Sequence, residues 1–309
     1  MITALAGGVG AARLLAGLVA VVDPAAVTAV VNTGDDTAIH GLAVSPDLDT
    51  VTYTLAGVVN PETGWGRRDE TWSAMEELRA LSGRLAWFNL GDRDLGTHLY
   101  RTARLAEGAP LSVVTGEVAA RWNIAVRLLP MSDDPVATRV TVAGGEEIGF
   151  QDYFVARRHS VAVSSVRFAG AGSAAPAPGV LEAIAQADTV VICPSNPVVS
   201  IGPVLAVPGI ADAVAARRQR AVAVSPIVAG RALKGPADRL LAELGHEPSV
   251  VGVARLWAPV AATLVVDTAD ADRAAEVEAA GMRCVVAPSV MTGPAEAARL
   301  ATTVLEAAG

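Results

Sequence analysis

The stretch that decides the fold is residues 27–50, which read VTAVVNTGDDTAIHGLAVSPDLDT. Its first five residues, VTAVV, are apolar or β-branched and predict a short buried strand. The strand is expected to end at Asn32, where a cluster of turn residues begins and four carboxylates follow. Open α/β sheets bind their ligands just outside the carboxyl ends of their strands. The stretch therefore predicts an α/β fold with a ligand site at this edge of the sheet.

The four carboxylates belong to Asp35, Asp36, Asp47 and Asp49. Proteins usually bind Mg²⁺ through one or two carboxylates together with phosphate oxygens, and this loop can supply the carboxylates. Turn chemistry is the other interpretation, because Asp and Gly are common loop residues and Asp47 or Asp49 could cap the next helix. For the whole cluster, opposite a second turn that is rich in glycine, we favour a metal-phosphate site.

The second turn is GGVG, from Gly7 to Gly10, between an apolar run at Ile2–Ala6 and an amphipathic stretch at Ala11–Val22. This order predicts a strand, a glycine turn and a helix. Gly7, Gly8 and Gly10 let the backbone approach an anion closely, and the start of the helix offers free N–H groups to it. We therefore interpret the turn as a cradle for phosphate.

The same turn is a poor match to the dinucleotide-binding fingerprint. Arg13 occupies the position of the third glycine, and the next predicted strand ends in Asn32, where an NAD site needs an acid for the ribose. The GK[ST] signature of a P-loop is absent as well. A nicotinamide-dependent oxidoreductase and a non-catalytic nucleotide-binding protein remain alternatives, because folds of this kind host both.

Composition narrows the class of protein. The 309 residues are 52% hydrophobic and 18% charged, which indicates a large buried core and no disorder. The net charge of −8 argues against a general nucleic-acid binder or a membrane-surface protein. The two cysteines, Cys193 and Cys284, show no CxxC spacing, and the apolar run from Leu14 to Val22 is too short to span a bilayer. We expect a soluble protein of the reducing cytoplasm.

The rest of the chain alternates between predicted strands and helices, so we expect a Rossmann-like, mostly parallel sheet with helices on both faces. From residue 137 the pattern changes to short alternating strands, which predicts a smaller inserted α+β subdomain at 137–178, between core segments 1–136 and 179–309. Helices are expected at 47–57, 70–81, 95–107 and 110–122, and further strands at 84–90, 125–129, 189–193, 221–224, 262–266 and 283–286.

Two further turns carry polar side chains that suit a ligand. Arg93 stands at a predicted helix start beside two acids, where its guanidinium could clamp a phosphate, although a surface ion pair would look the same. Ser195 and Asn196 follow a predicted strand and could donate to a base, sugar or phosphate, or simply cap and turn the chain. His98 is more typical of a packed or solvated histidine than of a catalyst.

Six ordered motifs make the chain resemble the 2-phospho-L-lactate transferase family of coenzyme F-420 biosynthesis over essentially its whole length. They are GGVGAARLL, VNTGDD with SPDLDT, LGDRD, LLPMSDDP, PSNPVVSIGP, and SPIVAG with GPAD. The resemblance implies an enzyme that joins a three-carbon acid phosphate to the deazaflavin Fo, from a guanosine-diphospho donor, with guanosine monophosphate (GMP) leaving. The stretch from Gly64 to Trp72 resembles the actinobacterial members, whose donor carries phosphoenolpyruvate rather than L-lactyl phosphate.

The resemblance also implies roles for particular residues. Asp35 and Asp47 would be the catalytic pair that ligates Mg²⁺, and the family is described as homodimeric. The residues implied to contact substrate are Gly7, Gly8, Gly10, Asn32, Asp36, Arg93, Ser132, Asp133, Ser195 and Asn196. Candidates for stacking on Fo are Trp65, Trp72 and Trp87, with core packing favoured for Trp87. Whether an aspartate also serves as general base stays open.

Overall fold

A computed structural model describes all residues, 1–309, and its centre is a seven-stranded parallel sheet. The strand order is β14-β13-β10-β9-β1-β2-β5. These strands are β1 Ile2–Ala6, β2 Val27–Val31, β5 Arg127–Pro130, β9 Thr189–Ile192, β10 Ala221–Val224, β13 Thr263–Val266 and β14 Arg283–Val286. The fold class predicted from the sequence is confirmed.

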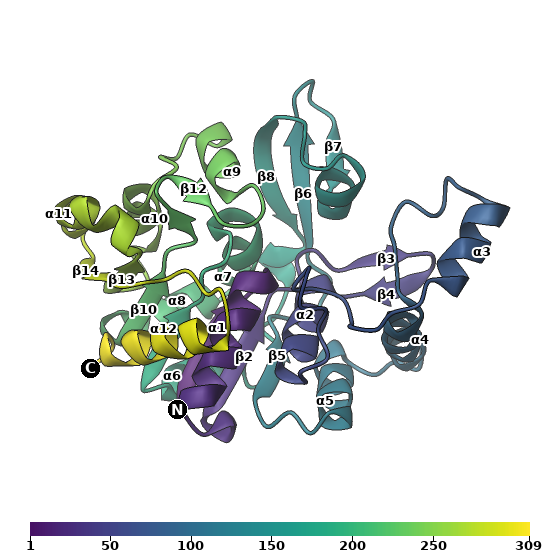
Figure 1. Cartoon of the computed structure of the whole chain (residues 1–309), viewed down its shortest axis with the longest axis horizontal. Helices are drawn as coiled ribbons and strands as arrows, with labels where there is room; N and C mark the ends of the chain where they lie inside the picture. Colours follow the sequence, from purple (N-terminus) through teal and green to yellow (C-terminus); the bar gives the residue numbers. More distant parts are fainter.

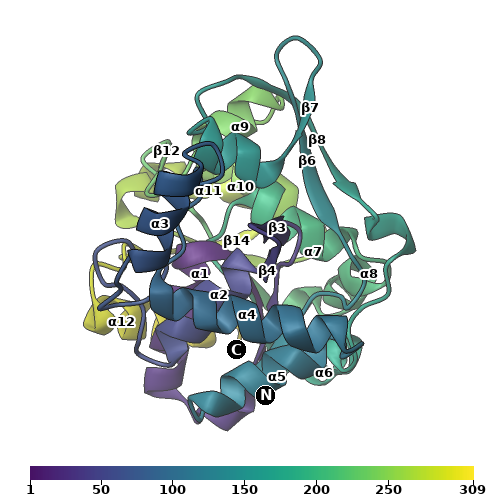
Figure 2. The same cartoon turned by 90° about the vertical axis from the view of Figure 1, so that its right-hand side faces the viewer.

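Helices cover both faces of this sheet. They are α1 Gly8–Val21, α2 Pro46–Leu55, α3 Ser73–Leu81, α4 Asp92–Ala106, α5 Leu111–Arg121, α6 Val180–Gln186, α7 Gly202–Ala206, α8 Ile210–Ala216, α9 Ala237–Glu243, α10 Val250–Trp257, α11 Ala274–Ala279 and α12 Pro294–Glu306. Helices α12, α1 and α2 lie side by side across one face (Figure 1). Helices α4 and α5 pack against each other (Figure 2), and α5 lies beside β5 at the edge of the sheet (Figure 1).

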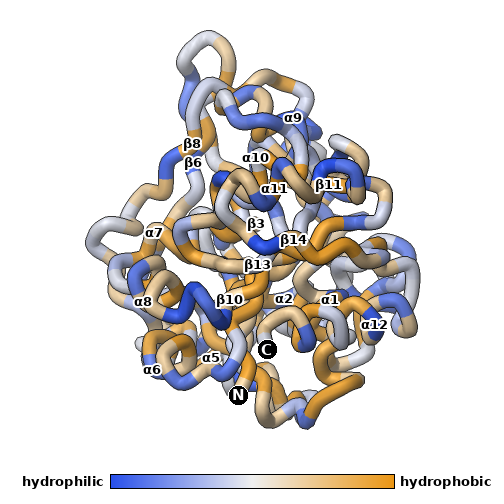
Figure 3. Tube along the Cα trace, turned by 90° about the vertical axis from the view of Figure 1, so that its left-hand side faces the viewer, coloured by the Kyte–Doolittle hydropathy of each residue, from blue (hydrophilic) through white to orange (hydrophobic).

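The central strands divide their side chains between two apolar layers. In β1, Ala4 and Ala6 face the layer that contains α1, α2 and α12, whereas Leu5 faces the layer that contains α6, α8 and α10. This alternation follows from the two-residue period of a strand, and burial on both faces explains why the strands are continuously apolar. Figure 3 shows the hydrophobic residues concentrated in strands such as β10 and β13 at the centre of the molecule.

Residues 137–178 contain a separate antiparallel sheet in the order β7-β6-β8. Its strands are β6 Ala137–Val142, β7 Glu147–Gly149 and β8 Val163–Ala169. Figure 1 shows this sheet rising above the central one, and Thr138 N donates to Gly34 O at 2.5 Å, which ties it to the loop after β2. The division of the chain into domains at residues 137 and 178 stays a prediction.

Two local predictions were incomplete or wrong. Within the acidic stretch the structure forms a hairpin of β3 Thr37–Ile39 and β4 Leu42–Val44, where the sequence analysis expected a loop. The predicted strand at Arg84–Leu90 is absent, because residues 83–88 form turns and a bend. Of its apolar side chains, Ala86, Phe88 and Leu90 pack in a small cluster with Met75, beside the hairpin, and no neighbouring strand pairs with the segment.

Two kinds of minor element complete the chain. A second hairpin pairs β11 Ile227–Val228 with β12 Arg231–Ala232. The short helical turns are η1 Pro24–Ala26, η2 Asp152–Ala156, η3 Ala171–Ser173, η4 Pro197–Ile201, η5 Arg218–Arg220 and η6 Thr268–Arg273.

No single helix is long and apolar enough to cross a membrane. Only the bent pair Pro197–Ala206 and Ile210–Ala216, at 95°, reaches that length and composition when counted together.

The sheet order places its switch point at β1. From β1 the chain proceeds to β2 and β5 on one side, and it later returns to β9 on the other side of β1 and continues to β10, β13 and β14. The turns that follow β1, β2 and β9 therefore meet at one edge. Such a reversal opens a crevice outside the carboxyl ends of the strands, where α/β proteins bind ligands.

Candidate active site

Asn32 joins two of the predicted carboxylates at this edge. It is the first residue after β2, and its Nδ2 donates to Asp47 Oδ2 at 2.9 Å and to Asp35 Oδ1 at 3.2 Å. Its Oδ1 accepts from Gly34 N at 2.8 Å, which fixes the amide orientation. The three side chains are all at least nine-tenths buried. The structure thus brings together the two aspartates for which a metal-binding role is predicted.

Asp47 does not cap helix α2, contrary to the turn interpretation. Ser45 holds the N-cap position with Pro46 after it, and the Ser45 hydroxyl donates to Asp36 Oδ2 at 2.7 Å instead of to the helix. Asp47 lies in the first turn with its carboxylate against Asn32. Asp49, two residues on, is paired with Arg101 of α4. Asp36 and Asp49 therefore have partners of their own, whereas Asp35 and Asp47 share Asn32.

The Asp35 and Asp47 pair carries uncompensated negative charge. Burial raises the pKa of Asp47 to about 6, although hydrogen bonds from Asn32 and from the Gly8 backbone oppose the rise. Burial, followed by repulsion from Asp47 and Asp36, raises the pKa of Asp35 well above its ordinary value. Neither carboxylate forms an ion pair, since Arg101 is committed to Asp49. Two adjacent buried carboxylates without a cationic partner suit a divalent cation.

The residues present fit Mg²⁺ in one particular way. Nowhere in the chain do three His, Cys, Asp or Glu side chains converge to hold a metal by themselves. Mg²⁺ needs only one or two carboxylates from the protein, because water molecules or phosphate oxygens fill its other coordination positions. Asp35 and Asp47 meet that demand, and a phosphate ligand would complete the coordination.

The glycine turn is packed between the carboxylates and the end of β9. A Cβ on Gly7 would lie 2.7 Å from Asp47 Oδ2, and a Cβ on Gly10 would lie 2.3 Å from Pro194 O. Both contacts are shorter than real Cβ atoms show, so neither position accepts a side chain without movement. Helix α1 starts at Gly8 with no acidic residue in its first turn. Its free N–H groups remain available to an anion.

Ser195 and Asn196 complete the crevice on the β9 side. Ser195 is 5% exposed, and its Oγ has no hydrogen-bond partner. Asn196 Oδ1 accepts from Val198 N at 2.9 Å and from Val199 N at 3.3 Å, so it caps the turn η4. Asn196 therefore caps a turn through its side-chain oxygen, which is one of the two roles considered for it. The Ser195 hydroxyl has no protein partner and is free to bind a ligand.

The other charged turns are held by protein partners. Ser132 Oγ donates to Ala175 O at 2.6 Å, and Asp133 accepts from Ser112 N and Oγ at 2.6 and 2.8 Å at the start of α5. Arg93 is exposed, and the start of α4 is already occupied by a carboxylate: Glu70 accepts from Arg93 N at 2.8 Å. These contacts engage the side chains of Ser132 and Asp133, whereas the Arg93 guanidinium has no protein partner, so its role as a phosphate clamp stays a prediction.

One residue next to the acidic pair carries no sequence signal. Gln151 Nε2 lies 3.4 Å from Asp35 Oδ2 and 3.5 Å from Asp35 O. It comes from residues 137–178, and only the packing of β6 against the loop after β2 brings it to the site. His98 is a packed histidine, as expected, 3.3 Å from Asp94 and 3.7 Å from Asp49.

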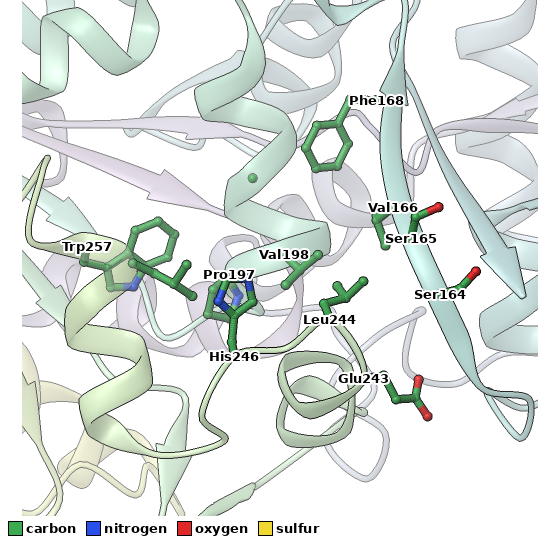
Figure 4. A pocket seen from close by; sticks show the side chains of 12 residues that line it. Ser164, Ser165, Val166, Phe168, Pro197, Val198, Glu243, Leu244, His246 and Trp257 are labelled. Atoms are coloured by element: carbon green, nitrogen blue, oxygen red, sulfur yellow. The ribbon is translucent and has the colours of Figure 1, made fainter.

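Two hollows lie apart from the acidic pair. The larger, about 610 Å³, lies between β8, η4 and α10 and is lined by residues that include Phe168, Val198 and Trp257 (Figure 4). A second, of about 470 Å³, lies beside the β3–β4 hairpin and includes Trp87, which is 38% exposed rather than part of the core. The chemistry at the switch point identifies the site better than the size of either hollow.

The chain is similar to known proteins over nearly its whole length. The family model described as 2-phospho-L-lactate transferase CofD matches residues 2–290. A phosphoenolpyruvate transferase from Kitasatospora aureofaciens is 49% identical over 98% of this chain and 96% of its own length. Another from Streptomyces griseus is 50% identical over 99% of this chain and 98% of its own, and one from Thermobifida fusca is 46% identical over 99% and 97%.

Solved structures show the same fold at greater distance. Two crystal structures of a UPF0052 family protein from Bacillus halodurans superpose with TM-scores of 0.62 and 0.63 at 19% and 17% identity. Each covers 98% of this chain and 98% of its own. At this identity the likeness is evidence for the fold alone.

Proposed function

The chain belongs to the 2-phospho-L-lactate transferase family of coenzyme F-420 biosynthesis, and on that premise we propose its complete reaction. A phosphoenolpyruvyl group passes from its guanosine-diphospho conjugate to the terminal ribityl hydroxyl of Fo. The new P–O bond forms to the ribityl oxygen, the bridging P–O bond breaks, the hydroxyl proton is lost and GMP leaves. The product is dehydro-F-420-0. The observation that carries the proposal is the Asn32-bridged pair of Asp35 and Asp47 beside the glycine turn.

The choice of donor is supported by the relatives. Proteins 46–50% identical to this chain over nearly its whole length are named phosphoenolpyruvate transferases. The enolpyruvyl and lactyl groups differ by an sp² against an sp³ carbon, a small difference in shape that a pocket discriminates about 10- to 200-fold. We therefore propose a preference for the enolpyruvyl donor and not an absolute requirement.

The protein's contribution is to position the diphosphate and to balance its charge. Phosphoryl transfer needs positioning and charge neutralisation more than covalent help from the protein. Asp35 and Asp47 would hold Mg²⁺, which when bound neutralises charge on the phosphates as the leaving group departs. Asn32 fixes both carboxylates, and the N–H groups of the first turn of α1 beyond Gly8 would face the phosphates.

The acceptor needs an aromatic surface near the crevice. Trp65 and Trp72 are 54% and 42% exposed, and Trp87 lines the hollow beside the β3–β4 hairpin. Large exposed aromatic side chains mark ligand-binding surfaces when they gather on one part of a protein. All three belong to the chain between α2 and α4, which we propose as the region that receives Fo.

The nicotinamide alternative finds no support at the site. A dinucleotide site needs an acid at the end of the second strand for the ribose hydroxyl. That position is Asn32, and its amide is already engaged with Asp35 and Asp47. A non-catalytic nucleotide sensor would bind guanosine diphosphate (GDP) but leave Fo unbound, so titration of the fluorescent Fo distinguishes it.

The decisive experiment is a reconstituted reaction followed by mass spectrometry. The purified protein is incubated with Fo and enolpyruvyl-diphospho-guanosine, with and without Mg²⁺. We expect dehydro-F-420-0 and GMP only when the cation is present. A parallel reaction with the lactyl donor measures the preference. Absence of product with both donors would refute the proposed reaction. Light scattering of the same sample tests the homodimer that the family resemblance implies.

A further inference from the structure

Lys234 is the only lysine among the 24 basic residues of the chain, and it contacts a loop that lies against Val9 of the glycine turn. It follows the β11–β12 hairpin, beyond the carboxyl end of β10. Its Nζ donates to Thr63 O at 2.8 Å and would lie 3.5 Å from a Cβ on Gly64. The same Cβ would lie 2.7 Å from Val9 Cγ1, so Lys234, the Thr63–Gly64 segment and Val9 meet on one side of the turn.

The segment around Thr63 is an ordered loop. Gly64 N donates to Asn60 O at 2.9 Å, Asn60 N donates to Gly66 O at 3.0 Å, and Thr63 Oγ1 donates to Trp65 O at 2.6 Å. Gly64 has φ +78°, the left-handed region, so a larger residue there would be strained as well as crowded. The loop therefore presents a fixed carbonyl to Lys234 beside the start of α1.

A second cation lies next to Lys234. Arg13 is one helical turn after Val9 in α1, and its Nη1 donates to Met291 O at 3.0 Å. Burial, followed by repulsion from Arg13, lowers the pKa of Lys234. Neither side chain is in any of the ion pairs of the structure. Lys234 is exposed, and two neighbouring cations without a carboxylate partner can bind an anion.

Asp47 and the loop approach the turn at different residues. Asp47 lies against Gly7, whereas Gly64 of the loop lies against Val9 and brings Lys234 to that side. An ammonium group has three donors, and Thr63 O takes one of them, so two remain for phosphate oxygens. A diphosphate seated on the N–H groups of α1 would then face Mg²⁺ at one end and the ammonium at the other.

We propose that Lys234, supported by Arg13, binds the phosphate of the departing GMP at the glycine turn, as a substrate-binding residue additional to those the sequence motifs indicate. The inference rests on the proposed guanosine-diphospho donor. Lys234 makes and breaks no covalent bond. By contacting both phosphate and Thr63 O, it links occupation of the turn to the position of the loop that carries Trp65.

The test is calorimetric binding of GDP, GMP and guanosine to the whole protein in Mg²⁺. Lys234→Gln keeps an N–H donor for Thr63 O but removes the charge, Lys234→Met removes both, and Lys234→Arg keeps the charge. Arg231→Gln, at an exposed residue of β12, is the matched control. Loss of one charge-assisted hydrogen bond weakens binding about 10- to 100-fold. We expect that loss for GDP in Lys234→Gln and Lys234→Met, little loss in Lys234→Arg, and unchanged guanosine binding in all.

The outcomes separate the possible roles. If Lys234→Gln binds GDP like the wild type while Lys234→Met does not, Lys234 only tethers the loop and the inference is wrong. Raised ionic strength should weaken GDP binding less in Lys234→Gln than in the wild type, because one screened attraction has been removed. Melting temperatures confirm that each variant is folded.

The inference and the reaction can fail independently. A wild type that binds GDP through Lys234 but gives no product with Fo would refute the reaction and leave the inference standing. A wild type that turns over while Lys234→Gln keeps normal affinity for GDP would refute the inference alone. A wild type that binds no GDP in Mg²⁺ would overturn both.

Discussion

Arg101 of α4 holds Asp49, two residues after Asp47 in α2. Its Nη1 donates to Asp49 Oδ2 at 3.1 Å and to Ala43 O at 3.3 Å, and the two side chains are 4% and 8% exposed. The pair fixes the first turn of α2 and engages the buried Arg101 guanidinium, which forms no ion pair with Asp35 or Asp47. Arg101 thus keeps α2 in place and leaves the acidic pair free for a metal.

Removal of Arg101 should destabilise the protein strongly. Arg101→Met keeps much of the volume but leaves Asp49 buried without a partner, and breaking a buried ion pair in this way costs about 3–5 kcal/mol. Urea unfolding measures the loss. The double variant Arg101→Met with Asp49→Leu removes both charges and should recover much of the stability. Equal stability of the single and double variants would contradict the buried-pair argument.

Substitution of either aspartate of the pair should reduce turnover but not stability. In Asp35→Asn or Asp47→Asn the cation loses a charged ligand, and we expect turnover to fall about 10²-fold or more, partly restored by high Mg²⁺. Measured without metal at pH 7, the unfolding free energy should be unchanged or raised, because the substitution removes repulsion between buried carboxylates.

A structural role for these aspartates predicts the reverse. If they only shape the turn, each substitution lowers the melting temperature, leaves specific activity near normal and gives no response to added Mg²⁺. Activity as a function of Mg²⁺ concentration, measured beside melting curves, decides between the two roles.

A methyl group at Gly7 should damage the site because of its contact with Asp47 Oδ2 at 2.7 Å. Gly7→Ala must displace the Asp47 carboxylate or the turn, so we expect weaker Mg²⁺ and GDP binding, measured by calorimetry, together with lower stability. Gly96→Ala is the control. Gly96 lies inside α4 with open space around its Cβ position, and alanine there should stabilise the helix by about 0.5–1 kcal/mol. Normal ligand binding by Gly7→Ala would contradict the close-contact argument.

The stabilising effect of Glu247 should depend on pH. Hydrogen bonds from Ser249 and Arg273 are the main causes that lower its pKa to about 2, below its ordinary value of 4.5. A depressed carboxyl pKa contributes stability that is fully present above the unfolded pKa and lost as pH falls through the folded one. We expect Glu247→Gln to lower the melting temperature near neutral pH. The difference from the wild type should shrink between about pH 4.5 and 2. A difference that does not vary with pH would contradict this.

The sequence predicted the central strands well because both faces of each strand are buried. The run Val27–Val31 has the same bounds in the structure and the sequence analysis, since a strand buried on both faces is a continuous β-branched run. Arg84–Leu90 is equally apolar, but Leu85 and Trp87 are 44% and 38% exposed and the rest packs beside the hairpin. Local composition does not say whether a neighbouring strand is available.

The missed β3–β4 hairpin has a different cause. Its two-residue turn is His40-Gly41, with φ of +53° and +81°, as a type I′ turn requires. The usual signals for this turn are Asn-Gly and Asp-Gly, and histidine at the first position hides it. The site residues also differ in how far the sequence predicts them. Asp35 and Asp47 can be predicted from the sequence because they belong to an acidic cluster after a strand. Gln151 and Lys234 approach the site only because distant segments of the chain pack together.

The position of β1 at the switch point has a consequence for synthesis on the ribosome. Its two neighbours are β2, which pairs Ile2 with Val27, and β9, which pairs Ile2 with Thr189. The nascent chain can complete one side of β1 early, but the other side stays unpaired until residue 189 has been translated and has left the ribosome. Non-local parallel pairing is slow to form, and an open apolar strand edge is a template for misassembly. The crevice at the switch point therefore cannot form until β9, which begins at Thr189, has been made.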